Sequence, residues 1–300
     1  MPTASIIIPT YNRPQLLPRA VESARAAGTD VEIIVVDDAS KDETASVCRE
    51  LSGIRYIRLE HNQGVAGARN VGILASSSGY IAFLDDDVTV DLSWLQNLTA
   101  SLQNAAWSGA GGPVLPEGTF TPPRWLSLDG RYALAPLALF DLGTEAGELN
   151  EPPFGANMAF RKTMFEKYGD FRTDLGRCGN NLLSNEDTEF GRRLMMAGEK
   201  LRFEPSAVVY HPVLENRLNK EYFLAWWLNK ARADIRTFGL LPGTKLQIAG
   251  VPLSMFRRLA RWTLQWITII HPARRFSCKL KVWTILGEIA ECYRSKRAKH

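Results

Sequence analysis

GYIAFLDDDVTV, residues 79–90, joins a short apolar run to three consecutive aspartates. Residues 80–84 have the β-branched and aromatic side chains typical of a buried strand, and Asp85, Asp86 and Asp87 follow directly. Three adjacent carboxylates repel one another, and a divalent cation held by carboxylates and substrate phosphates would offset that repulsion. A solvated acidic turn, or an aspartate that caps the next helix, is the alternative interpretation.

The first 115 residues alternate short strand-like runs with stretches of helical spacing. This pattern is typical of βαβ units and predicts an α/β fold with a doubly wound, mainly parallel sheet. Ligands of such sheets bind beyond the carboxyl ends of the strands. The predicted strands are 5–8, 32–36, 55–59, 80–84 and 109–114, and the predicted helices between them are 14–27, 42–51, 66–76 and 92–103.

Residues 115–153 are rich in Pro, Gly and aromatic residues and have no clean period, which predicts a long surface loop. Trp125 and Tyr132 in this loop are candidate acceptor contacts because of their position alone. The elements predicted after the loop are a strand at 156–160, a helix from residue 162, a helix at 186–197, a strand at 201–210 and helices from residue 219 onward.

Composition is that of a globular protein, and the net charge excludes one class of nucleic-acid-binding protein. The 300 residues include 45% hydrophobic and 23% charged side chains, as in ordinary globular domains. The net charge of +4 is too small for a protein that binds nucleic acid through an overall basic field. The charge is unevenly distributed, because residues 251–300 have 11 Lys or Arg against 2 Asp or Glu, whereas residues 1–250 have 25 against 30.

The chain is predicted to be cytoplasmic. Its four cysteines are far apart, the N-terminus lacks the basic and apolar regions of a signal peptide, and no C-terminal apolar stretch approaches the roughly 20 residues of a spanning helix. Two interpretations of the basic, aromatic C-terminal helices stay open. They lie on the inner face of the membrane as in a peripheral protein, or they pack on the rest of the chain with solvated basic faces.

The common nucleotide-binding fingerprints, G-x-G-x-x-G and G-x-x-x-x-G-K-[ST], do not occur in the sequence. Polar residues nonetheless follow two more predicted strands, TYNR at 10–13 and the pair Asp37 and Asp38. Carboxylates accept hydrogen bonds from a base or ribose, and Arg binds phosphate. Small residues at 62–70 allow a ligand to approach a helix start, with Arg69 in reach of a phosphate. Helix capping is the alternative for some of these residues.

Six motifs, in this order, resemble those of family 2 glycosyltransferases, and the match extends over about residues 4–212. The resemblance implies the GT-A fold, a nucleotide-sugar donor, Mn²⁺ or Mg²⁺ held by a D-x-D-type motif, and inversion at the anomeric carbon. The motifs are PTYNR (9–13), VVDDASKDE (35–43), NQGVAGARNVG (62–72), FLDDD (83–87), GANMAFRK (155–162) and NEDTEFGRR (185–193).

The resemblance also implies a role for each matching residue. Asp187 is expected to be the catalytic base, with Glu186 supporting an acceptor hydroxyl or fixing the loop. Asp87 and the later His211 are the expected metal ligands, although three consecutive aspartates leave the register open. The residues expected to bind the donor nucleotide are Pro9, Thr10, Tyr11, Arg13, Asp37, Asp38, Arg69, Asp85 and Asp86.

We therefore expect a catalytic domain at residues 1–215 and a helical, basic extension at 216–300. The expected reaction moves one sugar from a donor, expected to be a UDP-sugar, to a saccharide or lipid-linked acceptor in glycan, polysaccharide or glycolipid assembly. No nucleic-acid partner is expected. A nucleotidyltransferase lacks support from a Gly-rich, Lys-bearing loop and leaves the Glu186–Asp187 pair unexplained. A non-catalytic nucleotide-sugar-binding protein would have no chemical need for both Asp87 and Asp187.

Overall fold

The computed structural model describes residues 3–130, 132–179, 181–240 and 246–297, which form two compact units. The first unit consists of Met1–Thr119, Ala138–Gly179 and Glu186–Pro212, and the second consists of Phe120–Leu137, Asn180–Asn185 and Val213–His300. The second unit thus includes two segments that the sequence places well before the expected domain boundary at residue 215.

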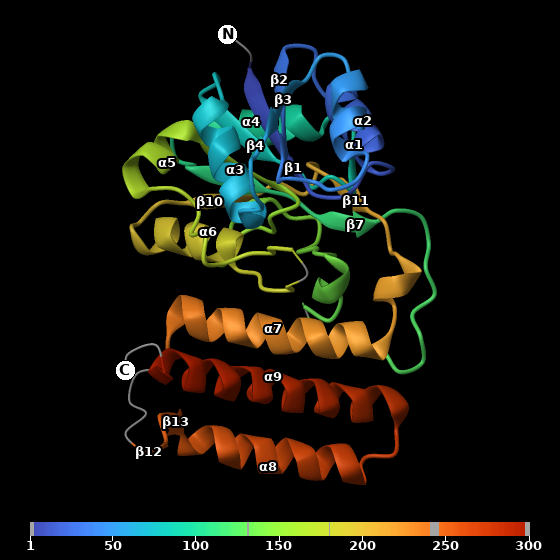
Figure 1. Cartoon of the computed structure of the whole chain (residues 1–300), viewed down its shortest axis with the longest axis vertical. Coiled ribbons are helices and arrows are strands. Elements are labelled where there is room, and N and C mark those ends of the chain that lie inside the picture. Colours follow the sequence, from blue (N-terminus) through green and yellow to red (C-terminus); the bar gives the residue numbers. More distant parts are fainter. Residues whose placement is uncertain (1–2, 131, 180, 241–245, 298–300) are drawn as a thin grey trace. The chain divides into compact units, whose positions relative to one another are not determined.

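The first unit is built on an eight-stranded mixed sheet with the strand order β3-β2-β1-β4-β9-β6-β10-β8 (Figure 1). β1 pairs in parallel with β2 and β4, whereas β9 runs antiparallel to β4 and β6. The predicted α/β fold with a mainly parallel sheet is confirmed. The strands are β1 Ala4–Thr10, β2 Val31–Asp37, β3 Arg55–Arg58, β4 Tyr80–Phe83, β6 Gly109–Gly111, β8 Gly147–Glu148, β9 Met158–Arg161 and β10 Leu201–Phe203.

The helices of the first unit follow the predicted order. Every residue of β1 is buried, as expected of a parallel strand covered on both faces. α3 packs on β1 and β2, and α4 packs on β6 and β9. The helices are α1 Leu17–Ala26, α2 Thr44–Glu50, α3 Gly64–Ala75, α4 Trp94–Gln103, α5 Lys162–Tyr168 and α6 Glu186–Met196.

Two single strands predicted at 109–114 and 201–210 are wrong in their extent, because each run divides between two sheets. A three-stranded sheet, ordered β5-β11-β7, takes the second half of each run. At Gly112 a Cβ atom would lie 2.1 Å from the carbonyl oxygen of Ala207, so only glycine fits where the first run turns. Pro205 interrupts the second run, since proline cannot donate to a ladder. The strands are β5 Thr89–Val90, β7 Val114–Pro116 and β11 Val209–His211.

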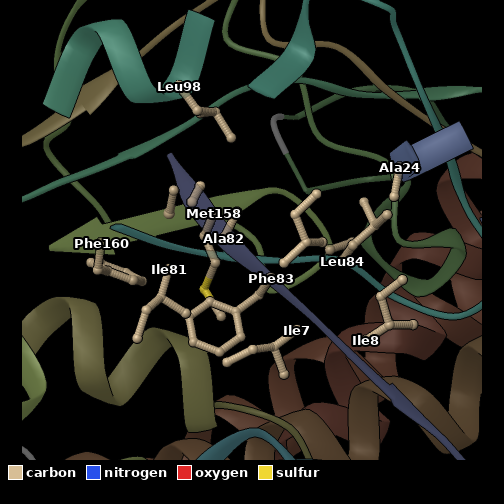
Figure 2. Packing of buried hydrophobic residues seen from close by; sticks show 14 of the residues in the cluster. Ile7, Ile8, Ala24, Ile81, Ala82, Phe83, Leu84, Leu98, Met158 and Phe160 are labelled. Atoms are coloured by element: carbon tan, nitrogen blue, oxygen red, sulfur yellow. The ribbon is translucent and has the colours of Figure 1, made fainter. Parts of the chain in front are cut away.

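The hydrophobic core lies around the central strands. Figure 2 shows Ile7, Ile81 and Phe83 beside Met158, and these side chains come from β1, β4 and β9. All four residues are fully buried. The apolar runs of strands far apart in the sequence therefore form one continuous core.

Buried Asn157 fixes the points at which the chain changes sheets. Its Oδ1 accepts a hydrogen bond from Trp94 Nε1 at 2.9 Å, and its Nδ2 donates to the carbonyl oxygens of Pro113 and Ala207 at 2.8 and 2.7 Å. Pro113 precedes β7 and Ala207 precedes β11. The Asn157 amide therefore joins α4 to both points at which the chain passes from the eight-stranded to the three-stranded sheet.

The second unit is mainly helical, and α9 lies between α7 and α8 (Figure 1). Among the described residues, none of its helices combines the length and the apolar composition that a bilayer-spanning helix requires. The elements are η1 Ala135–Leu137, η2 Glu215–Arg217, α7 Lys220–Phe238, β12 Gln247–Ile248, β13 Val251–Pro252, α8 Leu253–Thr268 and α9 Pro272–Arg297.

A buried carboxylate joins α7 to α9. The Glu291 side chain is fully buried and pairs with Arg232 at 3.2 Å, Arg236 at 2.8 Å and Arg294 at 2.7 Å. Burial alone would raise the pKa of Glu291, but hydrogen bonds from Arg236 and Arg294 outweigh it and lower that pKa to about 2. The charge of Glu291 is therefore balanced inside the unit, by two arginines of α7 and one of α9.

Replacing Asn157 tests the role of its amide. We expect Asn157→Ala to lower the free energy of unfolding by about 3 kcal/mol, because the indole N–H of Trp94 and the carbonyl of Ala207 would lose their buried partner. Asn97→Ala, which removes one exposed hydrogen bond to Ser206, is the control and should cost less than about 1 kcal/mol. Urea unfolding of both variants makes the comparison, and equal costs would contradict the assignment.

Candidate active site

The ends of β1, β2 and β4 meet at one edge of the sheet, because these strands are parallel neighbours. At this edge the Thr10 hydroxyl donates to Asp86 Oδ2 at 2.6 Å, and the backbone N–H of Asp38 donates to the Thr10 carbonyl at 2.9 Å. The structure thus brings together the polar residues that follow three different strands. Pro9 is buried in β1 opposite Val36, and half-buried Tyr11 follows the strand.

Asp37 and Asp38 are buried and hold the loops around this edge. Asp38 accepts hydrogen bonds from the backbone N–H groups of Gln63 at 2.7 Å and Gly64 at 2.8 Å, at the start of α3. Asp37 accepts from the Ser40 N–H at 2.8 Å and the Tyr56 hydroxyl at 2.9 Å. Contacts of these two carboxylates with a nucleotide stay a prediction, whereas their loop-capping contacts are observed.

Burial shifts the titration of several groups at this edge. It raises the pKa of Tyr56 to about 12, and the hydrogen bond to Asp37 adds to the effect. Burial also raises the pKa of Asp38, against the two backbone N–H groups that favour its charged form. Removal from water and the neighbouring Asp87 carboxylate raise the pKa of Asp86 to about 7. The edge therefore concentrates acidic groups that lack the solvation of bulk water.

Asp87 and His211 face each other, with 3.5 Å between Asp87 Oδ1 and His211 Nε2. Both are buried, and His211 Nδ1 lies 2.9 Å from the Pro212 carbonyl. A proton on Nδ1 would bond that carbonyl and leave the Nε2 lone pair directed at the aspartate side. Arg13 Nη1 lies 3.5 Å from Asp87 Oδ2. The structure thus brings together the two predicted metal ligands, which are 124 residues apart in the sequence.

This pair suits a Mn²⁺ or Mg²⁺ ion that takes its remaining ligands from substrate phosphates and water. Carboxylate and imidazole are both ligands of Mn²⁺, and Mg²⁺ is usually bound through one or two carboxylates plus phosphate. Within the part of the chain that the structure describes, no group of three or more His, Cys, Asp or Glu side chains could hold a metal by itself. The donor set therefore fits a metal that binds together with a diphosphate.

Arg69 occupies the centre of the site. Its guanidinium is buried and pairs with Glu186 Oε1 at 2.8 Å and with Asp85 Oδ1 at 3.1 Å. It also donates to the Gly155 carbonyl at 3.2 Å. Contact of Arg69 with a donor phosphate or ribose stays a prediction, and its observed contacts are with these protein groups. One cation therefore joins α3, the end of β4, the loop before β9 and the start of α6.

Asp187 and Glu186 begin α6. The backbone N–H of Gly155 donates to Asp187 Oδ2 at 2.7 Å, and the N–H of Thr188 donates to Oδ1 at 2.6 Å. These bonds fix the orientation of a carboxylate that stays half-exposed. Glu186 is buried, and its burial together with the neighbouring Asp187 raises its pKa, whereas Arg69 opposes the rise. The two adjacent carboxyls thus lie in different environments, one accessible and one paired internally.

Two residues missed as functional by the sequence reasoning shape this carboxylate pair. A Cβ on Gly155 would lie 2.9 Å from Arg69 Nη2 and 3.0 Å from Asp187 Oδ2, so a side chain would displace one of them. Asn185 is fully buried with a φ of 84° and directly precedes Glu186. Its amide donates to Asp234 Oδ1 on α7 at 2.8 Å. Both residues stand in the quoted motifs, and the positive φ that asparagine tolerates is the signal available for Asn185.

Arg69→Met tests the central cation. Methionine has a similar length and no charge, so Glu186 and Asp85 would lose their partner, and we expect the free energy of unfolding to fall by about 3 to 5 kcal/mol. Adding Glu186→Gln should recover part of this loss. Arg172→Met, which breaks the exposed 2.8 Å pair with Asp174, is the control and should cost about 1 kcal/mol or less. A loss for Arg69→Met as small as that of the control, in urea unfolding, would contradict the assignment.

Comparison with solved structures agrees with the observed fold. The structure of the mannosyltransferase PcManGT from Pyrobaculum calidifontis, in complex with GDP-Man and Mn²⁺, superposes with a TM-score of 0.61 and 18% sequence identity. The match covers 99% of this chain and 76% of that chain. At this identity the likeness concerns the fold, which is of the GT-A type.

Sequence comparison identifies the family. Glycosyltransferase AglE of Haloferax volcanii is 27% identical over 245 residues, covering 77% of this chain and 76% of that protein. Succinoglycan biosynthesis protein ExoM of Rhizobium meliloti is 28% identical over 246 residues, covering 79% and 74%. The family model for glycosyl transferase family 2 matches residues 5–169, which is more than half of the chain. These residues contain the strand ends, Arg69 and the Gly155 loop, and the chain therefore belongs to glycosyl transferase family 2.

Proposed function

We propose that this family 2 glycosyltransferase is a metal-dependent, inverting enzyme that moves one sugar from a nucleotide-sugar to an acceptor hydroxyl. The observation that carries the proposal is the position of Arg69, which pairs with Asp85 at the strand ends and with Glu186 beside Asp187. The predicted donor and base residues thus belong to one connected cluster. ExoM is by name a polysaccharide-biosynthesis protein, which supports glycan or polysaccharide assembly as the setting.

The donor is proposed to bind at the carboxyl ends of β1, β2 and β4. Half-exposed Tyr11 and Arg13 and the partly exposed Asp85 and Asp86 are the groups at this edge that a nucleotide can reach. A UDP-sugar is the expected donor. The solved mannosyltransferase binds GDP-Man with Mn²⁺, so guanine is the alternative base that an experiment must compare.

Asp87 and His211 would hold Mn²⁺ or Mg²⁺ together with the donor diphosphate. The ion supplies positive charge that stabilises the leaving nucleoside diphosphate. Arg13, 3.5 Å from Asp87, places a second positive charge at the same end of the sheet.

Asp187 is proposed to act as the base. As the acceptor oxygen forms its bond to the anomeric carbon, the bond from that carbon to the diphosphate breaks and its electron pair leaves with the diphosphate. Asp187 takes the hydroxyl proton in the same step. The N–H groups of Gly155 and Thr188 hold its carboxylate in place. Attack from the face opposite the leaving group inverts the anomeric configuration.

The protein is further proposed to be cytoplasmic and to contact the inner face of the membrane through α8. Leu264 and Ile267 on α8 are 64% and 67% exposed, and Ile270, just after the helix, is 92% exposed. Arg257 and Arg261 on α8 are exposed as well. Apolar side chains flanked by arginines are typical of helices that lie on an anionic membrane surface.

A thermal-shift series tests the donor site before the acceptor is known. Nucleoside diphosphates and nucleotide-sugars are compared with and without Mn²⁺, and we expect one base to stabilise the protein in a Mn²⁺-dependent way, by about 2.7 kcal/mol at a hundredfold excess over Kd. Asp87→Asn should lose the Mn²⁺-dependent part, whereas the exposed-residue control Asp170→Asn should keep it. Equal shifts with and without the metal would contradict metal-dependent binding.

Asp187→Asn tests the base. The change keeps the shape and the hydrogen-bond acceptor toward the Gly155 N–H, but it removes the charge and turns the amide NH₂ toward the Thr188 N–H. We expect donor affinity to persist and kcat to fall by about 10² to 10⁴-fold. Release of nucleoside diphosphate is followed with the acceptor selected from a panel of saccharides and lipid-linked saccharides. Glu189→Gln on the same helix is the matched control. Wild-type turnover by Asp187→Asn would refute its role as the base, and donor binding without any turnover by the native protein would favour the non-catalytic alternative.

A further inference from the structure

The second unit contains a partly open cavity of about 540 Å³. Its walls come from residues 126–130 and 132–133 and from α7, α8 and α9. The volume lies within the roughly 300–1,000 Å³ range of small-molecule sites in proteins. The walls are largely apolar and include Leu126, Tyr132, Trp227, Trp262, Phe276 and Leu280.

Ring contacts within the unit hold the walls in place. Trp125 packs edge-on against Phe223 at 5.4 Å and against Phe276 at 4.8 Å between ring centroids. Trp227 packs edge-on against Trp226 at 5.1 Å. Aromatic packing of this kind fixes side-chain orientation. The cavity is therefore a feature of the packed unit, and Trp125, expected from its position to contact an acceptor, supports the wall residue Phe276.

Charged side chains lie at the same cavity. Among the described lining residues these are Lys281, Arg258 and Asp129. The Lys281 ammonium lies 3.7 Å from the centroid of the Trp262 ring, and Lys281 is exposed. Arg258 pairs with Glu288 at 3.0 Å, and Asp129 accepts a hydrogen bond from Ser127 at 2.8 Å. Two cations thus adjoin a wall built mainly from hydrocarbon and aromatic rings.

We propose that this cavity binds a single-chain lipid phosphate, with the apolar chain against the aromatic walls and the phosphate at Lys281 and Arg258. An apolar chain gains free energy in proportion to the surface it buries, and a phosphate oxygen is a strong acceptor for both cations. The hydroxyl groups of Ser127, Tyr132, Ser277 and Thr284 also line the cavity, but most of its surface is apolar, which favours an alkyl chain over a free saccharide. The proposal goes beyond the transferase reaction and rests on the second unit alone.

Contact with a bilayer surface is a different mode of lipid binding, because a bilayer would touch exposed side chains rather than the cavity walls. The most exposed large apolar side chains of α8 and of the residues just after it, Leu264, Ile267 and Ile270, are not among those that line the cavity. Trp262 on the same helix does line it. A cavity of this size suits one alkyl chain, and the two modes of lipid contact can be separated by substitution.

Binding of decyl phosphate to the full chain, below the concentration at which it forms micelles, tests the proposal by calorimetry. We expect saturable binding with one molecule per chain. Each methylene group contributes about fourfold in affinity, so octyl phosphate should bind about fifteenfold more weakly. Decanol should bind more weakly than decyl phosphate, since it has the chain without the phosphate charge.

Two pairs of variants assign the contacts. Lys281→Gln changes an exposed residue and should lower the affinity for decyl phosphate about tenfold while leaving decanol binding unchanged. Lys279→Gln is its matched control, because the Lys279 ammonium also lies over tryptophan rings, at 5.2 Å from Trp266 and 5.0 Å from Trp283, outside the cavity lining. Trp227→Ala should weaken both ligands at least tenfold, with Trp266→Ala as its control. Circular dichroism verifies folding of each variant.

Three results would overturn the proposal. One is the absence of saturable binding by decyl phosphate. Another is unchanged affinity for it in Lys281→Gln and in folded Trp227→Ala. The third is binding only to phosphatidylglycerol vesicles, abolished by Leu264→Ser with Ile267→Ser and not by Trp227→Ala, which would assign the lipid contact to the membrane-facing side chains of α8.

Discussion

The rest of the site depends on one buried charge, the guanidinium of Arg69. A buried cation is stable only when partners replace the water it has lost, and here Glu186, Asp85 and the Gly155 carbonyl provide that replacement. Its Nε makes no hydrogen bond to any described residue, so the carboxylates carry most of the compensation. The same contacts determine where α6 begins relative to the strand ends. The position of Asp187 relative to Asp87 and His211 thus depends on the pairing of the Arg69 cation with Glu186 and Asp85.

Much of the first unit could be predicted from the sequence because its signals are local. The apolar runs ending in Asp85 and Asp37 determine both the strands and the edge at which ligands bind. The separation of β6 from β7 and of β10 from β11 was missed, although Gly112 and Pro205 mark both interruptions. Their meaning depends on a distant contact, that of Gly112 with the Ala207 carbonyl, which no local pattern reports.

In the candidate site, too, the sequence identified residues by their local motifs but did not predict contacts between residues far apart in the chain. The resemblance paired Asp87 with His211, and the structure places these two side chains together. Arg69 was expected to contact the donor, since an arginine among small residues at a helix start resembles a phosphate ligand. Its observed partner Glu186 lies 117 residues further along the chain. Buried Glu291 likewise takes two of its partners, Arg232 and Arg236, from α7, more than 50 residues earlier in the chain, which no local pattern reports.

The position of β9 in the sheet has a consequence for the order in which the protein is assembled during synthesis. β6 pairs with β9 and β10, and both of those strands are made after it. When the ribosome has produced β1 to β4 with their helices, that part can pair within itself, but β6 must wait for the chain to pass residue 161. The long segment between β7 and β9 therefore sets a delay during which an unpaired strand edge is open to neighbouring chains. Early docking of Met158 and Phe160 onto the finished strands ends that exposure and joins the two halves of the sheet.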